Sequence, residues 1–189
     1  IAGGGYWAGG SAPYATCRIL LDEKRNPLQV LTRGEHKAIH NQRVTLGPGD
    51  AAEVEAVRFI FGQCTGGVLP EAIADRLNGM GRPAPGGGQW SRMSVRAILD
   101  NEIYAGAMVW NKTSQKMKSP SRHNPVSEWI RTERAFESIV PCAVFERARE
   151  ILRQRDEARR YRYSEPGMVA KLKALYEQYG IVSHKLVAA

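Results

Sequence analysis

Residues 90–101, with the sequence WSRMSVRAILDN, most constrain the fold of this chain, because they predict a short capped helix with two unlike faces. Ser91 is suited to the N-cap, where its hydroxyl accepts a hydrogen bond from an unpaired first-turn N–H. Apolar side chains recur at helical spacing and are expected to face a core: Val95, Ile98 and Leu99. The outward face is then left with Arg92, Met93 and Arg96. This pattern is typical of a helix that enters a DNA groove.

Two earlier segments predict helices that pack against this one. The first spans about residues 50–63, where Asp50 and Glu53 fit a capping box, and the second spans about residues 69–78. Their expected core residues are Val54, Val57, Ile60 and Phe61 in the first and Leu69, Ile73 and Leu77 in the second. Helices this short are marginal alone, so the three must pack together. Such a unit, with basic residues on its last helix, resembles a helix-turn-helix module.

Other segments predict short strands. Residues 17–21 and 29–32 have the apolar, β-branched character of strands around a turn, while residues 35–45 are ambiguous. Alternation over residues 104–111 predicts a strand, which we expect to pair with residues 128–133.

The C-terminal part predicts further helices. One starts at Pro141 and runs to about Arg155, and its arginine-rich continuation to Tyr163 fits either an exposed helix with ion pairs or a phosphate-binding surface. Pro166 and Gly167 break this pattern, and helical spacing then resumes. The predicted fold class is therefore α+β and mainly helical: a tri-helical helix-turn-helix-like unit, short β-strands or a hairpin, and C-terminal helices.

Charge and cysteine content narrow the possible functions. Lys and Arg number 27 against 19 Asp and Glu, and the net charge of +8 favours a polyanionic partner, with a plain basic surface as the alternative. Cys17, Cys64 and Cys142 form no closely spaced pair, so neither a disulfide framework nor a zinc ribbon is predicted. His36 and His40 lack the Glu of a metallohydrolase helix between them. No catalytic residue, metal or cofactor is predicted.

Several segments together resemble a known family in their order and spacing. They are WAGGSAPY at 7–14, EVEAVRFIF at 53–61, AIADRLNGMG at 72–81, WSR at 90–92, VRAIL at 95–99 and NEIYAG at 101–106. The chain resembles the recombinase domain of the large serine recombinases, or site-specific integrases, over about residues 7–155. It departs from the family pattern at Ala15, usually glycine, and at Glu102, usually proline.

The resemblance implies that the catalytic serine lies in a separate N-terminal domain, which we expect this chain to lack. The chain would then be no enzyme by itself, and the parent protein would be a serine recombinase that exchanges DNA strands. Expected partners are double-stranded DNA at an attachment site and the parent's catalytic domain, with a homo-oligomer at full length and a monomer for this fragment. No membrane span or signal peptide is predicted, so a cytoplasmic, nucleoid-associated protein is expected.

The implied organisation is a glycine-rich linker arm at residues 1–16, a recombinase-type DNA-binding domain at 17–162 and the start of a truncated helical module at 163–189. Trp7 and Tyr14 are expected to anchor the arm on the domain surface rather than to stack on sugars.

The predicted DNA contacts fall into two groups. Base or groove contacts are expected from Arg92, Met93, Ser94 and Arg96. Phosphate contacts are expected from Arg82, Lys112, Lys116, Lys118 and Arg122. Alternatives stay open: a salt bridge from Arg96 to Asp100, a plain hairpin tip at residues 112–122, and, for the whole chain, a stand-alone helix-turn-helix transcriptional regulator or interaction module.

Overall fold

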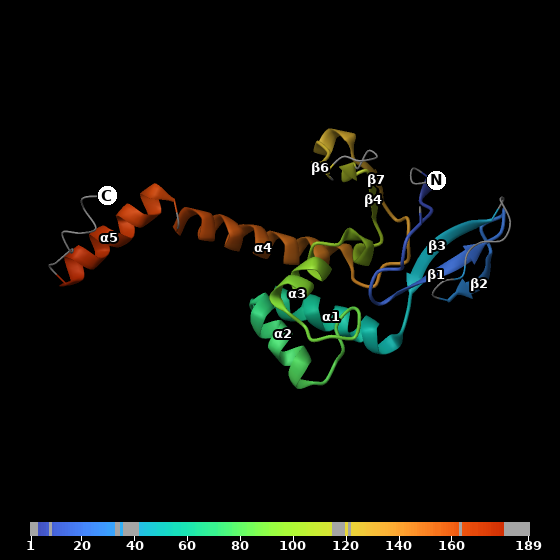
Figure 1. Cartoon of the computed structure of the whole chain (residues 1–189), viewed down its shortest axis with the longest axis horizontal. Coiled ribbons are helices and arrows are strands. Elements are labelled where there is room, and N and C mark those ends of the chain that lie inside the picture. Colours follow the sequence, from blue (N-terminus) through green and yellow to red (C-terminus); the bar gives the residue numbers. More distant parts are fainter. Residues whose placement is uncertain are drawn as a thin grey trace. The chain divides into compact units, whose positions relative to one another are not determined.

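The computed structural model describes residues 4–7, 9–32, 35, 42–114, 120, 122–162 and 164–179. The chain forms two compact units, Ile1–Arg149 and Glu150–Ala189. The first unit combines helices with small antiparallel sheets (Figure 1). The predicted α+β class is therefore confirmed.

Strands β1 (Thr16–Leu21), β2 (Pro27–Leu31) and β3 (Arg43–Pro48) form an antiparallel sheet in the order β2-β1-β3. Ile19 of the central strand lies opposite Val30 of β2 and Thr45 of β3. The buried leucines of the sheet are Leu20, Leu21, Leu31 and Leu46. Strands β1 and β2 confirm the prediction. Strand β3 begins near the end of the segment that the sequence left ambiguous, because its polar start carries no clear alternation and its pairing depends on β1.

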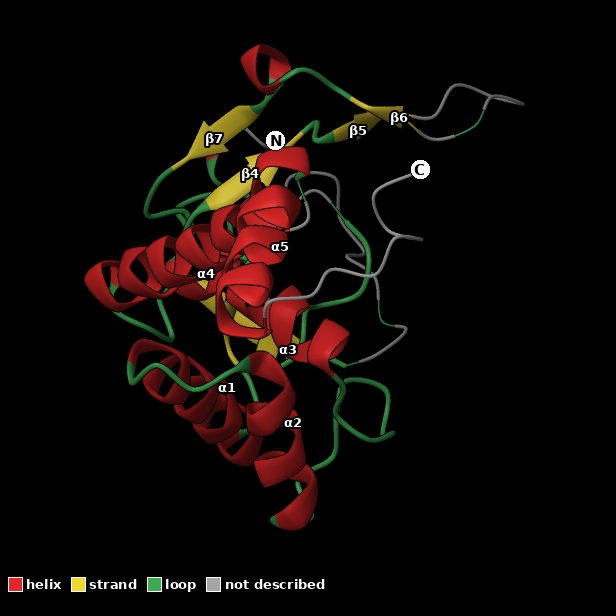
Figure 2. Ribbon diagram, turned by 90° about the vertical axis from the view of Figure 1, so that its left-hand side faces the viewer, coloured by secondary structure: helices red, strands yellow, loops and turns green. Residues whose placement is uncertain are grey.

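Helices α1 (Ala51–Thr65), α2 (Pro70–Gly79) and α3 (Arg92–Leu99) pack on one another, as predicted (Figure 2). Their fully buried side chains include Val57, Ile60, Phe61, Ile73, Leu77, Val95 and Leu99. The prediction that Leu69 belongs to this core is wrong. Leu69 occupies the N-cap of α2 and is 54% exposed, because the helix begins one residue later at Pro70.

Only the Asp50 half of the capping box predicted for the N-terminus of α1 forms. The Asp50 carboxylate accepts hydrogen bonds from the Ala52 and Glu53 N–H groups, at 2.9 and 3.1 Å. The Glu53 carboxylate, predicted to complete the capping box, accepts instead from the Ala15 N–H at 2.8 Å. This bond ties the N-terminal arm to α1.

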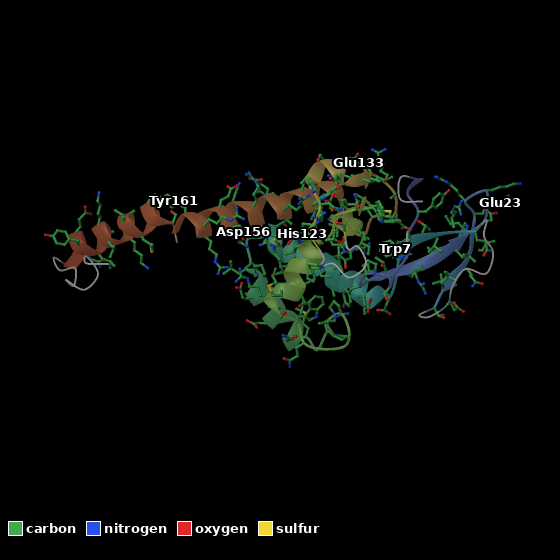
Figure 3. All side chains as sticks on the ribbon, turned by 45° about the horizontal axis from the view of Figure 1, so that its top comes forward. Trp7, Glu23, His123, Glu133, Asp156 and Tyr161 are labelled. Atoms are coloured by element: carbon green, nitrogen blue, oxygen red, sulfur yellow. The ribbon has the colours of Figure 1, made fainter. Side chains whose placement is uncertain are left out.

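Aromatic side chains fasten the N-terminal arm to the rest of the first unit, which confirms the predicted anchoring. The Trp7 ring, labelled in Figure 3, packs edge-on against Phe136 with centroids 6.3 Å apart. The Tyr14 ring packs edge-on against Trp90 at 5.4 Å, and its hydroxyl donates to the Pro83 carbonyl at 3.1 Å. Contacts at Trp7 and Tyr14 therefore hold the arm against the rest of the unit.

A small ribbon follows α3. The 3₁₀ helix η2 (Glu102–Ala105) leads into β4 (Met108–Trp110), which pairs with β7 (Ile130–Thr132). Between these strands lie β5 (Thr113–Ser114), β6 (Arg122–His123) and the 3₁₀ helix η3 (Val126–Glu128). The predicted pairing of the two segments is confirmed. The predicted strand start at Tyr104 is wrong, because Gly106 has a φ of +83° and redirects the chain before β4 begins.

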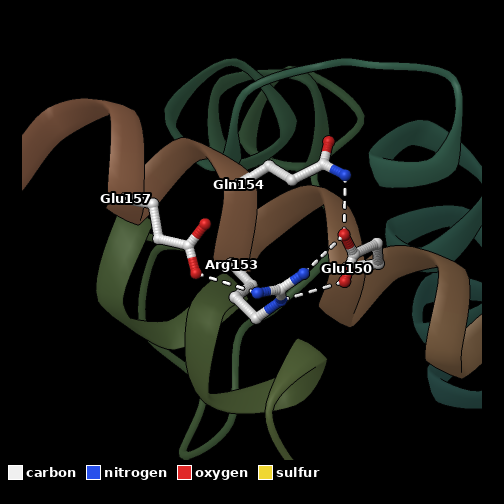
Figure 4. A network of polar contacts seen from close by, with 4 residues as sticks. All are labelled: Glu150, Arg153, Gln154 and Glu157. Atoms are coloured by element: carbon white, nitrogen blue, oxygen red, sulfur yellow. Dashed lines mark hydrogen bonds and ion pairs between the residues drawn. The ribbon is translucent and has the colours of Figure 1, made fainter.

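Helix α4 (Cys142–Arg162) follows Pro141, and Phe145 and Ala148 are buried as predicted. Beyond the first unit, α4 carries the ion pairs of an exposed helix. Arg153 contacts Glu150 and Glu157, each at 2.9 Å (Figure 4). The arginine-rich continuation is therefore helical and carries the ion pairs that one of the two interpretations expected.

Helix α5 (Glu165–Tyr179) begins one residue before the predicted break, so Pro166 and Gly167 lie within its first turn. The Ser164 hydroxyl accepts from the Gly167 N–H at 3.3 Å, and Pro166 fits the first turn. Within the described residues, no helix combines the length and apolar character that a membrane crossing requires.

Candidate nucleic-acid interface

Two sets of hydrogen bonds hold the N-terminal end of α3: a capping box, and bonds from Asn78 to the backbone of Trp90. Ser91 Oγ accepts from the Ser94 N–H at 3.2 Å, and Ser94 Oγ accepts from the Ser91 N–H at 2.8 Å. Asn78 of α2 bonds both backbone groups of Trp90, accepting from its N–H at 2.8 Å and donating to its carbonyl at 3.0 Å. Hydrogen bonds as well as apolar packing therefore position α3 against α2, a role for Asn78 that the sequence did not indicate.

The outward face of α3 carries the residues predicted to contact bases. Met93 is 73% exposed, and the side chains of Arg92 and Arg96 are 44% and 28% exposed. The opposite face buries Val95 and Leu99. The prediction of a helix with one buried apolar face and one basic face is confirmed.

Each arginine on this face pairs with a carboxylate. Arg92 Nε lies 3.2 Å from Glu71 Oε1, and Arg96 Nε lies 2.9 Å from Asp100 Oδ2, so the salt bridge that was left open as an alternative for Arg96 is present. Exposed pairs of this kind contribute about 0.2–1 kcal/mol. A bidentate contact between arginine and guanine is worth about 1–3 kcal/mol of discrimination. Each ion pair is therefore weak enough for its arginine to exchange the carboxylate for a contact with duplex DNA.

Two of the predicted contact residues also have structural roles. The Ser94 hydroxyl donates to the Ser91 carbonyl at 2.9 Å, so it is committed to the cap of α3. Arg82 donates to the Ala52 carbonyl at 3.3 Å and lies 3.1 Å from Glu55 Oε2. Arg82 thereby fastens the loop between α2 and α3 to α1.

The remaining predicted phosphate contacts belong to the segment after β4. Lys112 Nζ lies 5.3 Å from the centre of the Trp129 ring. Arg122 is exposed and pairs with Ser114 across β5 and β6. Lys116 and Lys118 lie outside the described residues.

Sequence reasoning missed a group of charges near β4. Lys112, Arg131 of β7 and Arg149 of α4 each approach the buried carboxylate of Glu102 in η2. We call these four residues the Glu102 cluster. The signal available in the sequence was the glutamate itself, at a position where the resembled family usually has proline.

In the part of the chain that the structure describes, no group of three or more His, Cys, Asp or Glu side chains is arranged to hold a metal ion. His36 and His40, the histidine pair four residues apart, lie outside the described residues.

A protein-family model described as Recombinase matches residues 51–155, more than half of the 189-residue chain. The chain belongs to the Recombinase family. The matched segment of this recombinase-family chain begins at α1 and ends within α4, so it contains α3 and the Glu102 cluster. Membership supports a role in site-specific recombination, with DNA as the partner. Among curated proteins, none matches the chain.

Proposed function

We propose that this chain is the DNA-binding part of a serine site-specific recombinase and that it binds double-stranded DNA at recombination attachment sites. The observation that carries the proposal is α3, which turns Arg92, Met93 and Arg96 outward in a chain of the Recombinase family. In this proposal strand exchange belongs to a catalytic domain elsewhere in the parent protein. The chain itself contributes recognition of the site.

The dimensions of α3 support insertion into the major groove. With its side chains an α-helix is roughly 10–12 Å across, which fits the roughly 12 Å width of the groove, and the 8 residues of α3 extend about 12 Å along the helix axis. Recognition helices contact base edges mainly through their N-terminal residues. Arg92, Met93 and Arg96 lie in the first five positions of α3, so they are placed for such contacts.

In this proposal basic side chains outside α3 supply the sequence-independent part of the binding. We assign phosphate contacts to Arg82, Lys112, Lys116, Lys118 and Arg122. Residues 17–162 act as the DNA-binding domain in this proposal, with residues 1–16 as the arm from the catalytic domain and residues 163–189 as the start of a further helical module. The full-length protein forms a homo-oligomer on the nucleoid.

A pool of random duplexes tests the proposal without assuming a site. The chain is incubated with the pool, and bound duplexes are recovered and sequenced. We expect one motif to be enriched, and we expect Arg92→Ala and Arg96→Ala to lose that enrichment, because base contacts carry the sequence information. Arg147→Ala, an exposed arginine of α4, is the control and keeps the motif.

Two outcomes contradict the proposal. In one, no motif is enriched; in the other, all variants enrich the same motif as the wild type. Sedimentation of the complex separates the proposal from a stand-alone regulator, which binds as a dimer to closely spaced half-sites. A recombinase DNA-binding part binds a single half-site as a monomer.

A further inference from the structure

The carboxylate of Glu102 is buried, and basic side chains from separate segments surround it. Glu102 is 6% exposed. Arg131 Nη2 lies 3.2 Å from Oε2, and Lys112 Nζ and Arg149 Nη1 lie 4.0 and 3.9 Å from Oε1. Within the described residues, Oε2 accepts no hydrogen bond. The contacts are therefore ion pairs that leave the carboxylate incompletely satisfied.

The charges of the Glu102 cluster do not balance. One carboxylate faces three cations in the described part of the chain, so the cluster carries a net charge of +2. A buried carboxylate requires a nearby cation to offset the hydration that it has lost. Arg131, at 3.2 Å, supplies that cation for Glu102. Lys112 and Arg149 add repulsion between like charges, which a second anion would relieve. The excess charge therefore favours an anionic ligand.

The cations of the cluster are held in place and remain accessible. Their side chains are 40–46% exposed, against 8% for the Glu102 side chain. The Lys112 ammonium lies 5.3 Å from the Trp129 ring, and the Arg149 guanidinium lies 5.7 Å from the Phe145 ring. These aromatic contacts restrict the two side chains. Cations ordered in advance lose less freedom when they bind an anion.

We propose that the Glu102 cluster is a binding site for a backbone phosphate of duplex DNA, in which Arg131 and Arg149 contact the phosphate beside Lys112. Glu102 is a positioning residue that gathers the cations. Arginine guanidinium groups match the oxygens of a phosphate. The proposal rests on the proposed function, because it requires a DNA ligand. It concerns residues outside α3, and its contact is independent of base sequence.

Single substitutions in the cluster test the proposal. Arg131→Ala and Arg149→Ala each remove one cation. Arg147→Ala is the matched control, because Arg147 is exposed on the same helix and lies two positions from Arg149, on a roughly opposite face. Binding of the full chain to a labelled random-sequence duplex is followed by fluorescence anisotropy over a series of salt concentrations.

We expect each cluster variant to bind about eightfold more weakly at about 0.1 M salt and to lower the slope of log K against log salt by about 0.9, the value for one phosphate contact. The control, Arg147→Ala, also removes one positive charge, but from a residue outside the proposed phosphate site. Its effect should stay below about twofold, because charges beyond roughly 10 Å are screened at this salt concentration.

Thermal unfolding verifies that each variant keeps the fold, and Arg131→Gln and Arg149→Gln replace any alanine variant that does not. If both cluster variants keep the salt slope of Arg147→Ala while the α3 variants lose motif selection, the cluster proposal fails and the proposed function stands. If the wild-type chain binds no duplex, both fail.

Discussion

The ion pair between Arg96 and Asp100 allows base recognition to be tested apart from helix stability. Arg96→Ala and Asp100→Asn break the same contact, in which Nε and Oδ2 are 2.9 Å apart on the surface of α3. Arg96→Ala also removes the guanidinium that we expect to contact a base. Asp100→Asn leaves that guanidinium in place. The pair of variants therefore isolates the arginine's contribution to DNA recognition.

The structure sets the expected magnitudes. An exposed pair of this type contributes about 0.3–0.5 kcal/mol, so neither variant should unfold the protein. Asp100 occupies the C-cap of α3, where a negative charge interacts unfavourably with the helix dipole. Asp100→Asn removes that charge, so part of the stability lost with the ion pair is regained. Loss of a bidentate base contact lowers the ratio of preferred to random duplex affinity by about 5- to 150-fold, equivalent to about 1–3 kcal/mol.

Anisotropy titrations with the enriched duplex and with a random duplex measure this ratio. Arg96→Ala should lower the ratio within the range above. Asp100→Asn should keep the ratio and tighten both complexes by about twofold, because the carboxylate that competes for Arg96 is gone. A base contact by Arg96 would be refuted if Arg96→Ala lost the same affinity for both duplexes. It would also be refuted if Asp100→Asn lowered the ratio of the two affinities as much as Arg96→Ala does.

Three further substitutions test the fold. Ala15→Gly should leave the free energy of unfolding within about 0.5 kcal/mol of the wild-type value, because glycine relieves the φ of +61° at Ala15 but loses a fully buried methyl group worth about 0.8 kcal/mol; a larger shift of the urea midpoint in either direction would contradict this. Gly106→Ala should lower it by about 1–3 kcal/mol, because its Cβ would lie 2.7 Å from the Phe136 carbonyl oxygen at a φ of +83°; a wild-type midpoint would count against that strain. Burial, helped by Glu53, raises the pKa of Tyr14 from 10.0 to about 12. The unfolded chain therefore ionises first, so the stability contributed by Tyr14 is complete below pH 10 and is lost as pH rises towards 12. Tyr14→Phe should make the decline of stability over that interval shallower, and an equally steep decline would disprove the assignment.

Interactions within one or two helical turns account for what the sequence predicted correctly. The cap at Ser91 and the buried positions Val95 and Leu99 depend on neighbours a few residues away in the same helix. The same signals identified which side chains of α3 face outward. The candidate base contacts were therefore accessible from the sequence.

Contacts between distant segments account for what the sequence predicted wrongly. Glu53 has the right spacing for a capping box, yet its carboxylate binds the Ala15 N–H, 38 positions away. No strand begins at Tyr104, because Gly106 redirects the chain before β4 and because the Tyr104 hydroxyl donates to the Tyr14 carbonyl at 3.0 Å, 90 positions away. In both cases a tertiary partner outweighs a local preference.

By itself the sequence determined the amphipathic helix α3, its cap and its basic face, because a cap and a helical period act between residues that are already neighbours. Only the tertiary structure decided the Glu102 cluster. Its members lie on η2, after β4, on β7 and on α4, and they meet because β4 pairs with β7 and because α4 packs its Phe145 side into the core. No sequence period relates such residues, since strand register and helix packing set the distances between them.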